Sequence, residues 1–171
     1  MDLNYTVPGG TCVADASWRS RPNGYRAVER TVAIGRGDED WASLSDAVMH
    51  WELKTRTGFT VKAVRRLAGP VRIHENYTAH LHIGPLKVRE PVRVVALVDE
   101  PDRRGFAYGT QGGHPLSGEG AFITHRDAEG TVWLTVRSLT RAARGPWMLA
   151  YPGARVAQGW WRRRYLRALS S

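Results

Sequence analysis

Residues 106–122 of the chain read FAYGTQGGHPLSGEGAF and carry side chains that can do acid–base chemistry. His114 has an intrinsic pKa near neutrality, and Glu119 follows five residues later, so a turn can bring the two together. A histidine oriented by a carboxylate is the smallest general acid–base pair. Tyr108 and Ser117 would add a phenol and a hydroxyl, and five glycines would let a ligand approach backbone N–H groups. This segment is therefore the first candidate for a functional site.

The same residues also fit a purely structural turn. Glycines supply the positive φ angles that tight connections between strands require, and His114-Pro115 can shape such a turn. Glu119 can pair with an arginine of a neighbouring strand. No nucleophile elbow, phosphate-binding loop or oxyanion motif accompanies these residues. Three interpretations stay open for the segment: a structural turn, a ligand contact and direct catalysis.

Other polar and aromatic residues are predicted to line a ligand cavity together with this segment. The seven tryptophans can stack on a flat ligand or simply form the core. Arg141 and Gln158, near the last strand and the long C-terminal helix, can orient a ligand headgroup or serve as structural hydrogen-bond partners. The predicted ligand-binding residues are Tyr108, Thr110, His114, Glu119, Arg141, Trp51, Trp133, Gln158 and Trp160.

A metal site at His74, Glu75, His80 and His82 is the remaining chemical candidate. His80 and His82 share one face of a predicted strand, as two metal ligands require. The other face of that strand is apolar, which places the histidines toward solvent. We therefore expect no metal, and nothing in the sequence points to any other cofactor.

The elements that must position these residues are mostly strands, followed by a long helix. DEDWASLSDAVMHWEL, which begins at Asp38, has helical spacing of its apolar residues and predicts a helix that ends before Gly58. Strands are predicted at 25–34, 59–67, 76–84, 92–100, 103–111, 119–126 and 131–140, and helical pieces at 146–151 and 152–169.

Sequential strands with helices at the ends of the series predict an α+β fold with an antiparallel sheet. A curved sheet of about six or seven strands that grips the C-terminal helix would bury both the tryptophan-rich helices and the one-sided strands. Such a helix-grip sandwich leaves room for a small-molecule pocket between its layers. We expect one domain over residues 1–171, with an irregular lead-in over residues 1–24.

The net charge of +9 is concentrated in the last quarter of the chain. No acid follows Glu129, whereas eight arginines do. Such a cluster is the footprint of nucleic acid or an anionic membrane as partner, or the solvated face of an amphipathic helix. Neither an RNP-type motif nor a helix-turn-helix pattern is present. The single cysteine, Cys12, and the lack of a signal-peptide pattern predict a cytoplasmic protein.

Stretches along the whole chain resemble a bacterial and plant family that is catalogued as a domain of unknown function. The resemblance rests on FAYGT, GHP and SG within 106–118, on NYTVPGGT at 4–11, on GRGDEDW at 35–41 and on later stretches up to residue 169. That family is similar to the Bet v 1/START-like helix-grip superfamily, whose members bind sterols, lipids or polyketides between sheet and helix. The resemblance implies this fold and a cavity, but no particular reaction.

We therefore expect a protein that binds a small hydrophobic or amphipathic ligand between its sheet and its C-terminal helix. One alternative is an enzyme of cyclase, dehydratase or hydrolase type, with His114 and Glu119 as acid and base. The other alternative is binding of nucleic acid or an anionic membrane through the C-terminal arginines.

Overall fold

The computed structural model describes residues 2–19, 21–64, 69–83, 86–143 and 147–169. This part of the chain forms seven strands and three helices. In chain order they are β1 (Arg26–Arg36), α1 (Gly37–Met49), α2 (Glu52–Thr55), β2 (Phe59–Ala63), β3 (Asn76–Ile83), β4 (Leu86–Glu100), β5 (Arg103–Thr110), β6 (Leu116–Arg126), β7 (Thr131–Ala142) and α3 (Trp147–Arg167).

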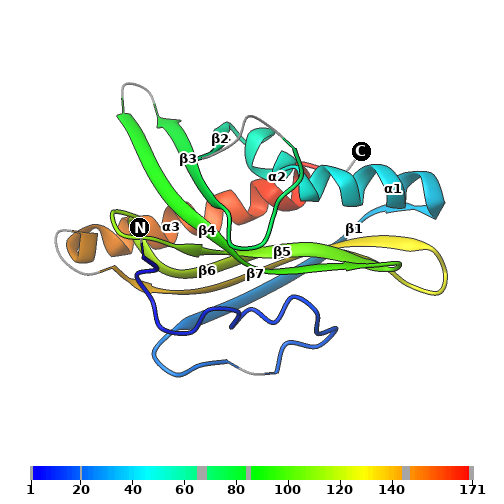
Figure 1. The fold of residues 1–171 in the computed structure, drawn as a ribbon, viewed down its shortest axis with the longest axis horizontal. Coiled ribbons are helices and arrows are strands. Elements are labelled where there is room, and N and C mark those ends of the chain that lie inside the picture. The colour runs from blue at the N-terminus through cyan, green and yellow to red at the C-terminus, as the bar shows by residue number, and fades with distance from the viewer. Residues whose placement is uncertain (1, 20, 65–68, 84–85, 144–146, 170–171) are drawn as a thin grey trace.

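The seven strands form one antiparallel sheet in the order β1-β7-β6-β5-β4-β3-β2, so that β1 and β2 are its edges. The register between β4 and β5 shifts between Val94 and Ala96. Such a bulge bends a strand, and in Figure 1 the β3–β4 hairpin turns toward the side of the sheet where α1 and α3 lie. The sheet is therefore concave toward the helices. This architecture confirms the predicted α+β fold with a curved antiparallel sheet and a long C-terminal helix.

The main hydrophobic core lies between the concave face of the sheet and the helices. Alternate residues of the strands point into it, and on β3 Tyr77, Ala79 and Leu81 are all buried, as the strand periodicity predicts. Phe106 and Phe122 extend this core through the middle of the sheet. Residues from all three helices complete the core, so the concave face is covered along most of its length.

The convex face is covered by residues 3–18, which we call the N-terminal segment and which form neither helix nor regular strand. Figure 1 shows this segment on the side of the sheet opposite α1 and α3. Coverage on both faces accounts for the continuous apolar run of β4, which the sequence pattern predicts for a doubly covered strand. A second, smaller apolar cluster lies on this side and comprises Val13, Val98, Ala107, Ala121 and Ile123.

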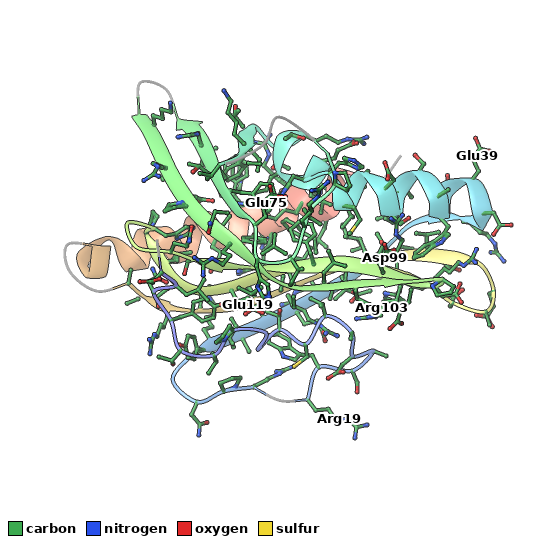
Figure 2. All side chains as sticks on the ribbon, viewed as in Figure 1. Arg19, Glu39, Glu75, Asp99, Arg103 and Glu119 are labelled. Carbon is green, nitrogen blue, oxygen red and sulfur yellow. The ribbon has the colours of Figure 1, made fainter. Side chains whose placement is uncertain are left out.

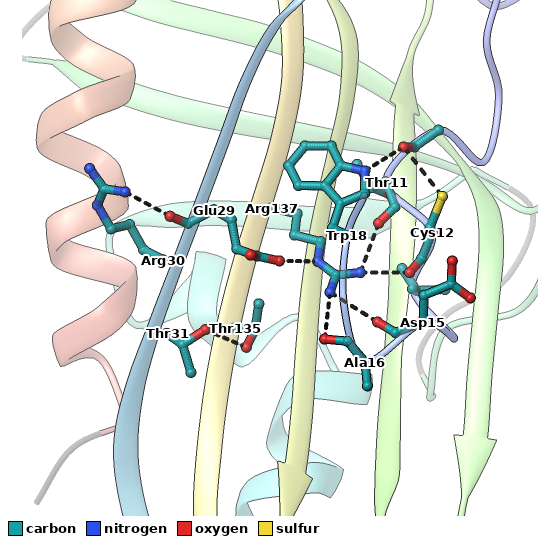
Figure 3. Close-up of polar contacts among 12 residues, drawn as sticks. Thr11, Cys12, Asp15, Ala16, Trp18, Glu29, Arg30, Thr31, Thr135 and Arg137 are labelled. Carbon is teal, nitrogen blue, oxygen red and sulfur yellow. Dashed lines mark hydrogen bonds and ion pairs between the residues drawn. The ribbon is translucent and has the colours of Figure 1, made fainter. Parts of the chain in front are cut away.

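Arg137 of β7 fixes the path of the N-terminal segment. Its guanidinium is almost completely buried and donates to the backbone carbonyl oxygens of Thr11, Cys12 and Asp15 (Figure 3). Its Nε donates to Glu29 Oε2 on the neighbouring strand over 2.6 Å. Because a buried guanidinium needs an acceptor for each N–H group, these carbonyl oxygens hold the segment in one place.

The first predicted helix is interrupted at Trp51. The backbone of Trp51 is left-handed, with φ 63° and ψ 16°, and it separates α1 from α2. Glycine usually occupies such a helix-ending position because a Cβ disfavours it. Here the Trp51 ring packs against Phe106 and Tyr108, with ring centroids 4.5 and 5.1 Å away. Tertiary packing therefore sets this helix end, and the local sequence does not.

The C-terminal helical region also differs from the prediction. Instead of two pieces that meet at Pro152, α3 is one helix that contains Pro152 in its second turn. A proline this close to the helix start removes one backbone hydrogen bond, and the later turns continue unaffected. The strand predicted at 59–67 is observed as β2 up to Ala63, whereas residues 65–68 and Pro146 lie outside the described residues.

Candidate functional site

A cavity of about 380 Å³ lies between the concave face of the sheet and α3. Small-molecule sites typically have volumes of roughly 300–1,000 Å³. The walls come from α2, from strands β2 to β7 and from α3, so segments distant in the sequence build the cavity together. Its larger apolar side chains are Phe59, Leu81, Val88, Phe122, Val136 and Trp161. Its principal polar side chains are Lys54, Glu90, Tyr108, His114, Gln158 and Arg162.

Lys54 and Glu90 form an ion pair at one end of the cavity. Lys54 is only 2% exposed, and its Nζ donates to Glu90 Oε2 over 2.7 Å. The same ammonium group lies 4.3 Å from the ring centroid of Phe59 and 5.2 Å from that of Tyr108. A carboxylate and two aromatic faces therefore surround the positive charge, and each of them is attractive to a cation.

Two local features bring this pair together. The left-handed turn at Trp51 redirects the chain into α2, whose last turn carries Lys54. On β4, Glu90 shares a face with Val88 and Val92 because side chains alternate along a strand. Val92 belongs to the concave core, so the carboxylate of Glu90 points into the same space.

The ion pair keeps both partners charged despite their burial. Burial is the largest single influence and opposes the charge on Lys54, but the attraction and hydrogen bond of Glu90, together with contributions from Tyr165 and Tyr108, raise the pKa of Lys54 above its usual value. Burial is likewise the largest single influence on Glu90 and opposes its charge, but the attraction and hydrogen bond of Lys54, with a further contribution from His114, lower the pKa of Glu90. The cavity thus contains a buried ammonium and a buried carboxylate at neutral pH.

His114 lies beside this pair as a neutral imidazole. Burial lowers the pKa of His114 to about 4. Its Nδ1 lies 2.9 Å from the backbone nitrogen of Leu116, which donates to it, and 3.1 Å from the carbonyl oxygen of the same residue. Nε2 lies 3.9 Å from Glu90 Oε2. The Nε2 side of the ring therefore faces the carboxylate end of the ion pair.

The predicted pairing of His114 with Glu119 is wrong. Side chains alternate along β6, so Glu119 shares a face with Ala121, which belongs to the smaller apolar cluster on the convex side. Phe122, on the opposite face, belongs to the concave core. Glu119 borders the cavity, but its carboxylate accepts hydrogen bonds from the backbone N–H groups of Gly9 and Thr11 and from other donors of the N-terminal segment. Figure 2 shows Glu119 between the sheet and this segment. Its role is to bind the N-terminal segment.

Arg141 and Trp133 also lie outside the cavity, contrary to prediction. Both occupy positions of β7 that alternate with the concave residues of that strand. The guanidinium of Arg141 lies 4.7 Å from the ring centroid of Tyr25, and its Nε lies 3.3 Å from Ser117 Oγ. Trp133 donates from Nε1 to Asp127 Oδ2 over 2.8 Å. These two side chains support the convex side and the last hairpin.

The tryptophan predictions are corrected in a similar way. Trp51 is buried in the core against Tyr108, but it does not line the cavity. Trp160 is 51% exposed, and its neighbour Trp161 forms the cavity wall instead, in edge contact with Phe59 at 4.9 Å. A shift of one residue along a helix rotates the side chain by about 100°, which is sufficient to exchange the two roles.

Five of the predicted residues border the cavity: Tyr108, Thr110, His114, Glu119 and Gln158. The hydroxyl of Thr110 is already bonded to Asn4 Oδ1 and to the backbone of Gly118. Gln158 of α3 lies 3.4 Å from Thr140 Oγ1 across the cavity. Of these five residues, Tyr108, His114 and Gln158 are the best placed to contact a ligand.

Lys54 and Glu90 are the residues that the sequence analysis missed. Lys54 is one of only three lysines in a chain with 22 arginines. The rare use of lysine is a signal that this position favours a compact ammonium group over a planar guanidinium group. Glu90 lies two residues before Val92, where the strand was predicted to begin. Extending the alternation backward from Val92 places Glu90 on the core face. A charge on a core face is the pattern that would have identified it.

The described part of the chain contains no group of three or more His, Cys, Asp or Glu side chains arranged to hold a metal ion. None of its helices combines the length and the apolar character that crossing a membrane requires. The chemistry that the cavity offers is instead that of Lys54, Glu90 and His114: N–H donors, one carboxylate and a neutral imidazole.

The curved sheet, the long helix laid across it and the cavity between them define a helix-grip fold of the Bet v 1-like type. The chain belongs to the family described as "Domain of unknown function (DUF1990)", whose model matches residues 11–168. It is also 32% identical over 161 residues to a UPF0548 protein of Deinococcus radiodurans, covering 86% of this chain and 78% of that protein. The family resemblance of the sequence motifs is thereby confirmed.

Solved structures support the fold at low sequence identity. The ginseng major latex-like protein 151 of Panax ginseng matches with a TM-score of 0.54 and 13% identity, over 84% of this chain and 94% of that one. Ara h 8.0201 matches with a TM-score of 0.51 and 13% identity, over 86% of this chain and 100% of its own. At such identities the likeness extends to the fold alone.

Proposed function

We propose that this protein binds a small hydrophobic or amphipathic molecule in the cavity between its sheet and α3. The observation that carries the proposal is the combination of apolar walls with a buried polar end at Lys54, Glu90 and His114. Burying an ion pair costs desolvation energy that apolar side chains of similar size would avoid. The presence of buried charges at this end of the cavity therefore favours a ligand that carries a polar group.

The fold class supports the same proposal. The helix-grip superfamily that the sequence resembles holds sterols, lipids or polyketides between sheet and helix, and the cavity lies at the corresponding place. Fold alone is a weak argument for function, so the polar end of the cavity carries more weight. The alternative of an enzyme built on His114 and Glu119 loses its support, since the Glu119 carboxylate binds the N-terminal segment.

The proposal is tested by native mass spectrometry of protein purified from cells without organic solvent. A bound small molecule is expected on the wild-type protein. Ser138→Phe places an aromatic ring in the cavity, where Ser138 is a wall residue and 6% exposed, and should abolish retention. Ser43→Phe adds the same ring on the exposed side of α1 and should retain the ligand.

A thermal-shift screen with fatty acids, sterols and aromatic polyketides complements the mass measurement. Binding to the folded state stabilises it by RT ln(1 + L/Kd), where L is the ligand concentration, so the melting temperature rises with the logarithm of that concentration once it exceeds Kd. The same compounds should fail to stabilise Ser138→Phe. If no bound mass is retained and no compound of the library stabilises the wild-type protein, the proposed function is wrong.

A further inference from the structure

A second hollow, an open groove of about 800 Å³, lies between the edge strand β1 and α3. Both its sides are rich in arginine. Arg26 and Arg30 come from β1, and Arg162 and Arg163 come from α3. Trp160, half exposed, and Val156 add an apolar rim. The groove thus differs from the first cavity in being open and strongly basic.

Among the described residues that line the groove, Glu29 is the only acid. Its carboxylate already accepts a hydrogen bond from Arg137 Nε over 2.6 Å on the other side of the sheet (Figure 3), so it does not compensate the charges of the groove. Arg26 and Arg30 flank Glu29 at the intervening register positions, opposite Thr140 and Val136, and therefore face α3.

Arg162 meets these two arginines from the helix side. Burial, and then the like charges of Arg26 and Arg30, lower the pKa of Arg162. Its one hydrogen bond within the described residues is a long contact of 3.5 Å from Nη1 to Ser138 Oγ. Arg30 Nη1 donates to the backbone carbonyl oxygen of Glu29 over 2.8 Å. The three guanidinium groups carry more N–H groups than these acceptors can satisfy, so N–H donors remain for a ligand in the groove. An anion in that space would relieve the repulsion and accept those hydrogen bonds.

Arg162 also borders the ligand cavity. It lies next to Ser138 of β7, whereas the Lys54–Glu90 pair lies toward β4, with β5 and β6 between these two strands in the sheet. The cavity therefore has two polar ends. The Lys54 charge is neutralised by Glu90, so the end at Arg162 is the one with uncompensated positive charge.

We propose that Arg26, Arg30 and Arg162 bind the phosphate group of an amphipathic phosphate monoester whose apolar chain occupies the cavity. This inference rests on the proposed function and specifies the chemical class of its ligand. A phosphate monoester near neutral pH carries close to two negative charges and three terminal oxygens, which suits three converging guanidinium groups better than the single charge of a carboxylate. The half-exposed Trp160 lies at the rim of the same groove.

Isothermal titration calorimetry at low salt with four probes tests the proposal: octyl phosphate, octanoate, octanol and inorganic phosphate. Octyl phosphate should bind most tightly of the four, because only it supplies both the chain and the dianion. Arg162→Gln, and separately Arg26→Gln/Arg30→Gln, should weaken octyl phosphate binding by about tenfold or more, as loss of a charge-assisted hydrogen bond does. Octanol binding should be unchanged in both variants.

Arg19→Gln is the matched control, because Arg19 is exposed, carries the same charge and lies beyond the opposite face of the sheet (Figure 2). It should leave all four affinities unchanged. Melting curves confirm that each variant is folded. Equal binding of octanol and octyl phosphate, or an unaffected Arg162→Gln variant, would overturn the inference while leaving the cavity as a binding site.

The remaining outcomes are equally decisive. If octanoate binds as tightly as octyl phosphate, phosphate is the wrong headgroup. If inorganic phosphate binds as tightly as octyl phosphate, the anion site is independent of the cavity, and the amphipathic ligand is wrong. If none of the three eight-carbon probes (octyl phosphate, octanoate and octanol) binds, the proposed function itself is contradicted together with this inference.

Discussion

Lys54 Nζ and Glu90 Oε2 lie 2.7 Å apart inside the cavity, although 36 residues separate them in the chain. One comes from the short helix α2 and the other from β4, so the pair links the helical layer to the sheet. Each partner is buried and each keeps the other charged. The pair is therefore energetically coupled, and its two members should respond to mutation as a unit.

Loss of one partner should cost far more than loss of both. Lys54→Met or Glu90→Leu alone leaves an uncompensated buried charge and should reduce the free energy of unfolding by about 3–5 kcal/mol. The double variant removes both charges and should recover most of that loss. Urea denaturation of the four proteins measures the coupling. Additive effects of the two substitutions would contradict the ion pair.

The stability contributed by His114 should depend on pH below neutrality. The unfolded chain protonates His114 near pH 6.5, whereas the folded protein does so only near 4. Between these values the unfolded state binds more protons, so the free energy of unfolding falls as the pH decreases from 6.5 to 4, by about 3 kcal/mol at most. Above pH 6.5 the contribution is constant.

His114→Asn provides the reference for this measurement, because the amide oxygen can accept the Leu116 N–H in place of Nδ1 but does not titrate. Denaturation of both proteins across the pH range isolates the histidine from all other titrating groups, including the neighbouring Lys54 and Glu90. Parallel stability curves for the two proteins would show that His114 titrates normally.

Glu119→Gln should destabilise the protein without weakening ligand binding. The Glu119 carboxylate accepts hydrogen bonds from N–H and O–H donors of the N-terminal segment. In glutamine, an amide NH₂ group would replace one of the accepting oxygens and would face these donors. We expect a loss of about 2–4 kcal/mol in unfolding free energy, measured by urea denaturation, and unchanged affinity by calorimetry. Glu129→Gln, at an exposed position, is the control. Weaker binding with normal stability would place Glu119 in the ligand site after all.

Alanine substitution of the two adjacent tryptophans of α3 should affect ligand affinity very differently. Trp161→Ala removes a wall of the cavity and should weaken binding of an apolar ligand by about tenfold or more, since a large aromatic contact is lost. Trp160→Ala removes the same side chain from the exposed face and should leave binding of a ligand without a charged headgroup, such as octanol, unchanged. Equal effects of the two substitutions would contradict the observed orientation of α3.

Much of the fold is predictable because it depends on periodicity. The alternation of Tyr77, Ala79 and Leu81 identifies a strand and its buried face, and the unbroken apolar run from Val94 to Val98 identifies a strand that is covered twice. Neither inference needs knowledge of what the strand packs against. Helix ends are different, since the left-handed Trp51 is tolerated only because its ring fits between strands far away in the sequence.

The site was less predictable because it depends on which face of a strand a residue occupies. His114 borders the cavity, whereas the Glu119 carboxylate binds the N-terminal segment and Arg141 lies on an alternate position of β7 that points away from the cavity. A spacing of five residues, as between His114 and Glu119, allows a turn to bring two backbone segments together. It does not ensure that the two side chains point to the same face of the sheet. Lys54 and Glu90 meet through a turn and a bulged strand, and no local pattern in the sequence joins them.

The two-sided use of β6 and β7 has a consequence for how this scaffold can change. Val136, Ser138 and Thr140 of β7 line the cavity, whereas Glu119 and Arg137, which also border it, direct their charged groups to the N-terminal segment. Natural variation or a designed library can therefore diversify every second position to alter selectivity. The intervening positions preserve foldability, so new specificities can arise without first sacrificing the scaffold.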